Sequence, residues 1–314
     1  MILVGGENIV DLIQFDEQAG APVFKGLVGG SPFNVAFAIG RQNVPVGYLS
    51  PLSTDRFGDA FSHTLDEAGV EIVSKRAAAP SSMAVVTLEN GQPAYSIYRN
   101  GTSERMADFA LLRNKLADAE VQVIHTGSLA IAQGADADEW AALYILGHDQ
   151  GLLTSLDPNI RALLIDDRPA YFVRLEKMLK KTDVLKLSDE DLEWLFPDLS
   201  QDEAFDAIAE KTAAAIVVLT RGGEGCRART AHGDFSVDAH PVRQLADTVG
   251  AGDTFMATML TGLYKIGCMD RSQLEHVTQD DWRALLQRAG KAAALNCEHA
   301  GCNPPNQAQL DGQS

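Results

Sequence analysis

The chain has 314 residues, of which 46% are hydrophobic, and its formal net charge is −17. This length and apolar content predict one large α/β domain or two modest ones with a sizeable core. The acidic balance argues against nucleic-acid binding, because phosphate backbones are bound by clusters of Lys and Arg, and the sequence has no such cluster.

The first residues and the cysteines indicate the cellular compartment of the protein. Met1–Val4 predicts a short strand that ends at Gly5, without the basic segment and apolar run of a secretory signal. No stretch approaches the roughly 18 to 20 apolar residues of a membrane helix. The four cysteines form no Cys-x-x-Cys pair and have no His at zinc-finger spacing. We therefore expect a cytoplasmic protein with reduced thiols, no membrane partner and no structural metal.

Two segments in the first third of the chain predict a small β-structured lid. Residues 12–27 hold a polar turn followed by an apolar run, and residues 83–98 predict two strands joined at Asn90-Gly91, a strong hairpin signal. Hairpins inserted into an α/β framework are typical of a lid. The expected lid is residues 12–27 and 83–104, and the expected large domain is residues 1–11, 28–82 and 105–314.

The remaining two-thirds of the chain alternates strands with helices. Short apolar strands are predicted at 121–125, 152–156, 184–187 and 215–219, and helices at 136–148, 168–180, 189–195, 201–212, 252–266 and 281–298. Apolar strands separated by amphipathic helices are typical of a parallel sheet covered on both faces. The predicted fold class is α/β, a doubly wound and mostly parallel sheet flanked by helices, with the small lid.

A glycine-rich turn before the helix of 252–266 carries the most chemical information. Gly250, Ala251 and Gly252 allow a tight turn, and the helix points its unpaired N–H groups and positive dipole end at it. Such a turn suits phosphate oxygens and developing negative charge. Asp253 would repel a phosphate, so its place here makes sense if it takes the proton of an attacking hydroxyl. A simple helix cap is its alternative role.

This turn resembles the C-terminal signature of the ribokinase (PfkB) family of carbohydrate kinases, in the run Asp247-Thr248-Val249-Gly250-Ala251-Gly252-Asp253-Thr254-Phe255. The family's N-terminal signature has a counterpart in Gly29-Gly30-Ser31-Pro32-Phe33-Asn34-Val35-Ala36. Gly6 to Asp11 resembles the family's first strand with its sugar-binding Asp. The resemblance covers nearly the whole chain and is strongest to the fructokinase branch at Asp157–Arg161, Lys186–Glu190 and Thr220–Arg227.

The resemblance implies a ribokinase-like, ATP-dependent sugar kinase with fructose as the leading acceptor, and a role for each candidate residue. Asp253 would be the base, and the N–H groups of Gly250, Ala251 and Gly252 the anion hole. Asp11, Gly30 and Asn34 would hold sugar hydroxyls, with Arg99 and Arg161 also at the substrate. The nucleotide would be contacted by Lys186, Ser188, Thr220, Gly222, Gly223, Gly225 and Asn296. Arg161 and Lys186 would face its phosphates. Asp191 would hold Mg²⁺ through water, and Asp247 would adjoin a monovalent cation such as K⁺.

Some of these residues have alternative, structural roles. Asn34 can cap the helix that follows it, Arg99 can be an exposed lid arginine, and Lys186 can extend its ammonium from a buried strand to solvent. The chain also departs from the family at the Asn-x-x-Glu motif, which is Ser188-x-x-Asp191 here.

Other functions stay open on the sequence alone. A 2-keto-3-deoxygluconate kinase is the first alternative, because Arg99 and Arg161 can bind a carboxylate, and a nucleoside kinase is the next. Gly223-x-Gly225-x-x-Ala228 matches a dinucleotide fingerprint, but residues 226–237 predict a hairpin where that fingerprint requires a helix, which argues against an NAD-dependent dehydrogenase. Asp253 argues against a non-catalytic sugar-binding protein. The resemblance also implies a homodimer through the lid.

Overall fold

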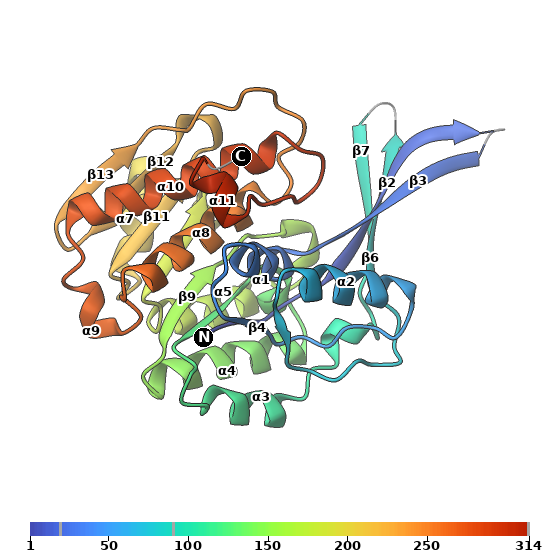
Figure 1. Ribbon diagram of the computed structural model, residues 1–314, viewed down its shortest axis with the longest axis horizontal. Helices are drawn as coiled ribbons and strands as arrows, with labels where there is room; N and C mark the ends of the chain where they lie inside the picture. The colour runs from blue at the N-terminus through green and yellow to red at the C-terminus, as the bar shows by residue number, and fades with distance from the viewer. Residues whose placement is uncertain (19–20, 90–91, 313–314) are drawn as a thin grey trace.

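Two β-sheets organise the chain, for which the computed structural model describes residues 1–18, 21–89 and 92–312 (Figure 1). The larger sheet has nine strands in the order β13-β12-β11-β10-β9-β8-β1-β4-β5. Its strands pair in parallel from β11 to β5, whereas β12 and β13 are antiparallel. The strands are β1 Ile2–Val4, β4 Val46–Tyr48, β5 Glu71–Ile72, β8 Val123–Gly127, β9 Leu153–Asp157, β10 Val184–Ser188, β11 Ile216–Thr220, β12 Cys226–Thr230 and β13 Gly233–Val237. This mostly parallel sheet confirms the predicted α/β class.

Helices cover both faces of the larger sheet, which explains why its strands are continuous apolar runs. Ile2 and Val4 belong to the core cluster shared with α1, α2, α8 and α10, whereas Leu3 between them belongs to the cluster shared with α3, α4, α5 and α7. The helices are α1 Ser31–Arg41, α2 Arg56–Glu67, α3 Phe109–Leu116, α4 Ala135–Asp149, α5 Arg168–Leu179, α6 Asp189–Leu195, α7 Gln201–Glu210, α8 Ala251–Lys265, α9 Arg271–Leu274, α10 Gln279–Cys297 and α11 Gln307–Leu310.

The smaller sheet projects from this body (Figure 1). Its strands are β2 Ile9–Gln18, β3 Ala21–Gly29, β6 Ser82–Glu89 and β7 Gln92–Tyr98, in the order β3-β2-β6-β7. Strand β2 is antiparallel to β3 and parallel to β6, and β6 is antiparallel to β7. The predicted hairpin turn at Asn90-Gly91 lies outside the described residues, but the two strands that flank it pair from Glu89 and Gln92 onward.

Two details near the N-terminus differ from the prediction. The strand predicted at Met1–Val4 is present as β1, but Asp11 lies on a separate strand, β2, so Gly6 to Asp11 is not part of the first strand. The reason is that Gly6, at φ +144°, lets the chain pass close to α1, where a side chain would lie 2.4 Å from Pro32 Cγ. Strand β2 then continues through most of the expected polar turn, with a register irregularity between Gln14 and Asp16.

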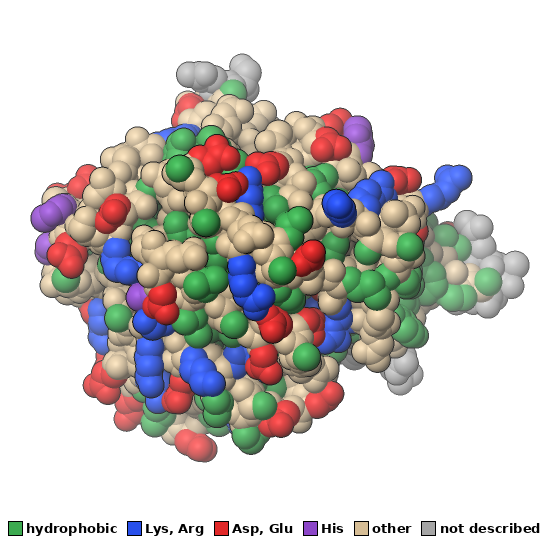
Figure 2. All heavy atoms as spheres, turned by 90° about the horizontal axis from the view of Figure 1, so that it is seen from below, with side chains coloured by type: hydrophobic (Ala, Val, Ile, Leu, Met, Phe, Trp, Pro, Cys, Tyr) green, Lys and Arg blue, Asp and Glu red, His purple; other side chains and the backbone are tan. Residues whose placement is uncertain are grey.

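One face of the molecule carries charges of both signs. On the face shown in Figure 2, Lys and Arg side chains are interspersed with Asp and Glu. Within the part of the chain that the structure describes, no helix has both the length and the hydropathy needed to cross a membrane.

Candidate active site

The first turns of α1 and α8 meet at the carboxylate of Asp253. Gly250, at φ +75°, is the N-cap of α8 in the left-handed region, and a side chain there would lie 2.5 Å from Cys302 Sγ. Asp253 follows in the first turn and is buried. Ser31 Oγ donates to Asp253 Oδ1 at 2.7 Å, and Asn34 Nδ2 donates to Oδ2 at 2.7 Å. Both oxygens of the carboxylate are therefore held by helix α1.

This arrangement excludes the alternative capping roles. No side chain caps α8 at Gly250, and Asp253 bonds to another helix instead. The N-cap of α1 is Gly30, so Asn34 lies inside that helix and does not cap it. Gly30 has φ +108°, and a Cβ there would lie 2.6 Å from the Glu7 carbonyl oxygen, so only glycine fits this approach.

Asn34 also faces Asp11, on the smaller sheet. A Cβ on Gly29 would lie 3.4 Å from Asp11 Oδ2 and 3.8 Å from Asn34 Oδ1, so both oxygens border the place that this glycine leaves open. Asn34 Oδ1 is buried and accepts no hydrogen bond from any described residue. A carboxylate and a free amide oxygen that border the same space are suited to neighbouring hydroxyl donors.

The charge around Asp11 comes from three elements. Burial raises the pKa of Asp11 to about 6, Arg161 opposes this rise, and Asp247 adds to it. Arg161, just before the 3₁₀ turn at Ala162–Leu164, and Asp247, in the loop before α8, are therefore near enough to influence the charge of this carboxylate. The structure thus brings Asp11, Asn34, Arg161, Asp247 and Asp253 into one region.

A buried ion pair lies beside the glycine-rich turn. Lys186 Nζ contacts Asp157 Oδ2 at 2.7 Å, with side-chain exposures of only 4% and 1%. Lys186 therefore does not extend to solvent, and that alternative is wrong. A Cβ on Gly252 would lie 3.3 Å from Lys186 Nζ, which places the ammonium against the turn.

Electrostatics keeps this lysine charged. Burial lowers the pKa of Lys186, but Asp157, followed by Asp191 and Asp253, raises it above its usual value. Burial also raises the pKa of Asp157 to about 6, against the effect of Lys186, so an ionised pair is expected near neutral pH. Asp157 Oδ1 has no partner among the described residues. No role was predicted for Asp157 from the sequence, although it directly follows the strand predicted at 152–156, and ligands of open α/β sheets bind outside the carboxyl ends of the strands.

Ser188 and Asp191 form a capping box at the start of α6. Asp191 Oδ2 accepts the Ser188 N–H at 2.8 Å, Asp191 Oδ1 accepts the Ile160 N–H at 2.6 Å, and Ser188 Oγ accepts the Asp191 N–H at 3.1 Å. The departure from the family motif therefore makes a good helix start. Each carboxylate oxygen keeps capacity for a further donor such as water.

The glycines after β11 differ in what surrounds them. Added side chains at Gly222 and Gly223 would meet no atom within 4 Å, so a ligand can approach this backbone. Gly225, at φ +87°, is structural, because a Cβ would lie 2.1 Å from the Val237 carbonyl oxygen. Thr220 Oγ1 donates to the Leu187 carbonyl at 3.2 Å. The segment continues into the predicted hairpin β12–β13 and not into a helix. A dinucleotide fingerprint requires a helix at this point, so the hairpin argues against that function.

Asn296 and Asp247 form hydrogen bonds that hold the loop leading into the glycine-rich turn. Asn296 is fully buried, its Nδ2 donates to the Val249 carbonyl at 2.8 Å, and its Oδ1 accepts the Asn303 N–H at 2.8 Å. Asp247 accepts N–H groups from Val249 at 3.0 Å and from Gly301 at 2.9 Å. Both residues tie the loop before α8 to the chain after α10, so the structure gives Asn296 a positioning role.

Arg99 is neither exposed nor unpaired, which corrects the alternative reading of this residue. Its Nε and Nη2 donate to Glu104 at 2.9 and 3.2 Å, and its Nη1 donates to the Leu129 carbonyl at 3.3 Å. Both side chains of this ion pair are buried. The guanidinium is therefore engaged on every nitrogen at the base of the smaller sheet.

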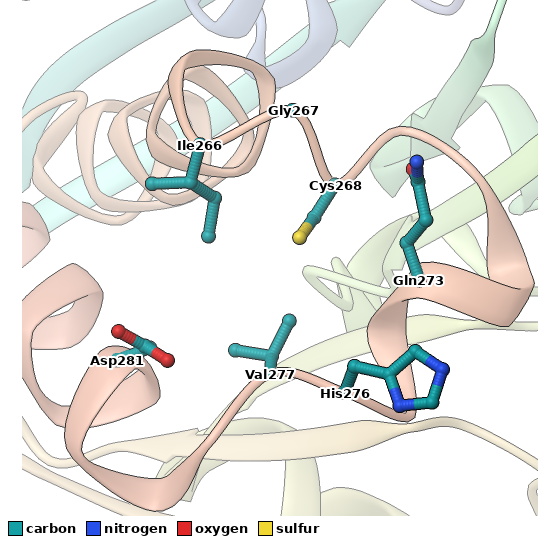
Figure 3. Close-up of a pocket in the computed structure, with 7 residues that line it drawn as sticks. All are labelled: Ile266, Gly267, Cys268, Gln273, His276, Val277 and Asp281. Carbon is teal, nitrogen blue, oxygen red and sulfur yellow. The ribbon is translucent and has the colours of Figure 1, made fainter.

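The hollow drawn in Figure 3 lies elsewhere. It has a volume of about 340 Å³, and Ile266, Cys268 and Val277 point into it. Ile266 follows the C-terminal end of α8, roughly 20 Å along the helix axis from Asp253 at 1.5 Å per residue. Across the described ranges, no group of three or more His, Cys, Asp or Glu side chains could hold a metal ion.

Comparison with known proteins identifies the family to which the chain is similar. Residues 1–309 match the pfkB family carbohydrate kinase profile. The chain is 33% identical over 287 residues to a fructokinase of Rhizobium leguminosarum bv. trifolii, covering 90% of this chain and 86% of that protein. It is 30% identical over 312 residues to fructokinase-1 of Oryza sativa subsp. japonica, covering 97% and 94%.

Solved structures show the same fold. A fructokinase with bound ATP from Xylella fastidiosa superimposes with a TM-score of 0.88 at 24% identity, covering 99% of this chain and 97% of that one. A fructokinase from Vibrio cholerae O395 in the fructose, ADP and calcium ion bound form gives 0.83 at 25% identity, with the same coverage. The whole-length match and the two glycine-rich signatures agree, and the chain belongs to the pfkB family of carbohydrate kinases.

Proposed function

We propose that this carbohydrate kinase transfers the γ-phosphate of ATP to a hydroxyl of fructose, with Asp253 as the general base. The observation that carries the proposal is the Asp253 carboxylate, fixed by Ser31 and Asn34 beside the turn of Gly250 to Gly252. The names of its relatives support the acceptor, because several are fructokinases and one was solved with fructose and ADP.

The geometry supports an in-line transfer in which positioning and charge do most of the work. Asp11 and Asn34 Oδ1 would hold the sugar hydroxyls, with Gly30 beneath them and Arg161 near Asp11. The attacking hydroxyl gives its proton to Asp253 and forms a bond to the γ-phosphorus, while the bond from that phosphorus to the oxygen of the ADP leaving group breaks. The N–H groups of Gly250, Ala251 and Gly252, with the positive end of α8, would stabilise the negative charge that develops.

Nucleotide contacts would come from the ends of β10 and β11. The ammonium of Lys186 is 3.3 Å from the Cβ position of Gly252 and is suited to a phosphate oxygen there. We propose that the open backbone at Gly222 and Gly223 approaches the nucleotide, with Thr220 and Ser188 at the adjacent strand ends. Gly225 and Asn296 would act by holding this loop and the turn in shape.

We propose Mg²⁺ as the metal that accompanies ATP. Mg²⁺ prefers phosphates and water over all-protein cages, and Asp191, whose oxygens each accept one N–H and can accept another hydrogen bond, fits a role through metal-bound water. When bound, the ion would neutralise charge on the β- and γ-phosphates. A monovalent cation such as K⁺ would lie near Asp247, whose carboxylate is partly exposed and joins two loops.

We further propose that residues 12–27 and 83–104 act as a lid and that two chains pair through it. Phe15 and Tyr98 on the smaller sheet are 64% and 57% exposed, and hydrophobic side chains gather where this sheet projects in Figure 2. A homodimer would cover them, and light scattering that gives a monomer mass would contradict this. The four free cysteines suit the reducing cytoplasm.

A 2-keto-3-deoxygluconate kinase is the second candidate, and a nucleoside kinase the third. A keto-acid acceptor needs a cation for its carboxylate, and the pairing of Arg99 with Glu104 leaves Arg161 for that purpose. The fructokinase proposal is favoured because Asp11 and Asn34 suit neutral hydroxyls.

ADP release by the purified protein over sugars, nucleosides and keto acids tests the proposal. We expect fructose to have the highest kcat/KM, and a ratio that favours the keto acid by about ten-fold or more would overturn the acceptor. Asp253→Asn keeps the size of the side chain but removes the base, so kcat should fall about 10²- to 10⁴-fold. An Asn variant with activity within a few-fold of the parent would overturn the catalytic role.

A further inference from the structure

The hydroxyl of Ser31 is a buried polar group that the proposed chemistry does not yet use. Ser31 is the first residue of α1 and is 7% exposed. Its Oγ donates to Asp253 Oδ1 at 2.7 Å, and its backbone N–H donates to Glu7 Oε1 at 3.1 Å. One residue therefore links a second buried carboxylate to the proposed base.

The backbone at Ser31 has little room to move. Gly30 approaches the Glu7 carbonyl so closely that a Cβ would lie 2.6 Å from it. Glu7 itself is buried, and burial raises the pKa of its carboxyl while Arg99 opposes that rise. Arg99 is in turn paired with Glu104 at the base of the smaller sheet. The backbone that carries the Ser31 hydroxyl is thus held against Glu7, whose carboxylate accepts the Ser31 N–H.

Hydrogen bonds, more than rotamer preference, orient an aspartate carboxylate, because its terminal torsion is broad. Asp253 has two such bonds from described side chains, from Ser31 and from Asn34. Asn34 is expected to bind the sugar as well, so its bond to Asp253 shares the amide with the substrate. The hydrogen bond from Ser31 to Asp253 does not compete with sugar binding in the same way.

We propose that Ser31 is a positioning residue for Asp253, and that its hydroxyl sets which carboxylate oxygen meets the attacking hydroxyl. The inference rests on the proposed function, in which Asp253 is the base. Ser31 exchanges no proton with substrate and touches no reacting atom; it acts through Asp253. Misplacement of a catalytic group by about 1 Å can cost about 10²-fold in rate, so a single donor at this distance has a measurable effect.

The test compares Ser31→Ala with Ser31→Thr and with Ser74→Ala. Ser74 is a matched control, because it is 8% exposed and its Oγ donates at 2.5 Å to the Leu49 carbonyl, so its loss also removes one buried hydrogen bond. We expect the melting temperature to fall by a similar amount in Ser31→Ala and in Ser74→Ala. In Ser31→Ala alone, kcat should fall about ten-fold or more, the size of a lost bond to a charged group. KM for ATP should change by less than about two-fold, and Ser31→Thr should recover most of kcat.

A cycle with Asp253→Asn separates this inference from the proposed function. If Ser31 acts through Asp253, adding Ser31→Ala to Asp253→Asn should lower the residual rate by less than about two-fold. A folded Ser31→Ala variant with parental kcat, a full additional loss in the double variant, or a raised KM for sugar at unchanged kcat would each overturn the positioning role. An active Asp253→Asn variant would instead overturn the proposed base.

Discussion

Gly252→Ala separates the chemistry of the glycine-rich turn from the fold that carries it. Gly252 lies in the first turn of α8, and an added methyl group would lie 3.3 Å from Lys186 Nζ and 3.7 Å from Cε. Alanine is favoured over glycine in a helix by roughly 0.5 to 1 kcal/mol. We therefore expect the free energy of unfolding to stay the same or rise slightly.

Turnover should nevertheless fall. The methyl group would lie against the Lys186 ammonium, on the side of the turn proposed to meet the phosphate, and would hinder the contact between this ammonium and a phosphate oxygen. Losing one charge-assisted contact is worth about 1.5 to 3 kcal/mol. At about 1.4 kcal/mol per factor of ten, kcat should drop roughly 10- to 100-fold. ADP release gives kcat, and urea unfolding gives the stability.

Gly250→Ala is the matched control. Gly250 has φ +75°, and its methyl group would lie 2.5 Å from Cys302 Sγ and 2.8 Å from Cys302 Cβ. A left-handed backbone costs about 1 to 2 kcal/mol and overpacking about 1 to 3 kcal/mol, so stability should fall by roughly 2 to 5 kcal/mol. If Gly252→Ala were destabilised in the same way, with parental kcat per folded molecule, the reasoning about the anion-binding turn would be refuted.

Two further predictions concern the acceptor side. Burial raises the pKa of Asp11 to about 6, so the folded state disfavours the ionised carboxylate, and the stability that comes from the protonated form is lost as pH rises through about 6. Asp11→Asn should therefore stabilise the protein by about 1 to 3 kcal/mol at pH 7.5, lose that gain near pH 4 and bind fructose poorly. An equal gain in stability at both pH values would contradict the raised pKa of Asp11. Amide exchange should slow in residues 9–18, 21–29 and 82–89 when fructose is added at saturation, and unchanged exchange there would argue against a lid.

The fold was predictable because its signals are local. Most strands of the parallel sheet are short apolar runs, and most helices, α2, α7 and α10 among them, have a side-chain cap at their start. The helix predicted at 281–298 spans Gln279–Cys297, with a capping box at Thr278 that marks its start. The two glycine signatures were equally readable, since a turn that needs φ above zero leaves few residues to choose from.

The polar partners within the site were not predictable in the same way. Lys186 and Asp157 lie on neighbouring strands, 29 positions apart, and Ser31 and Asp253 are 222 positions apart. No period or motif relates such residues, because strand order and helix packing decide which of them meet. Arg99 illustrates the error that follows, since an arginine after a hairpin suggested exposure, whereas burial beside Glu104 satisfies its charge.

The pairing of Arg99 also bears on the choice of acceptor. Asp11, Asp247 and Asp253 all border the region where the sugar would bind, and Asp247 already raises the pKa of Asp11. A keto-acid acceptor would add another negative charge beside these carboxylates, with Arg161 as the cation at hand. Like charges within a few ångströms in a partly buried site disfavour binding unless each is matched by a cation. A neutral ketose such as fructose makes no such demand and offers hydroxyl donors to Asp11 and Asn34, so the charge balance of the site favours a neutral acceptor over a keto acid independently of any likeness between sequences.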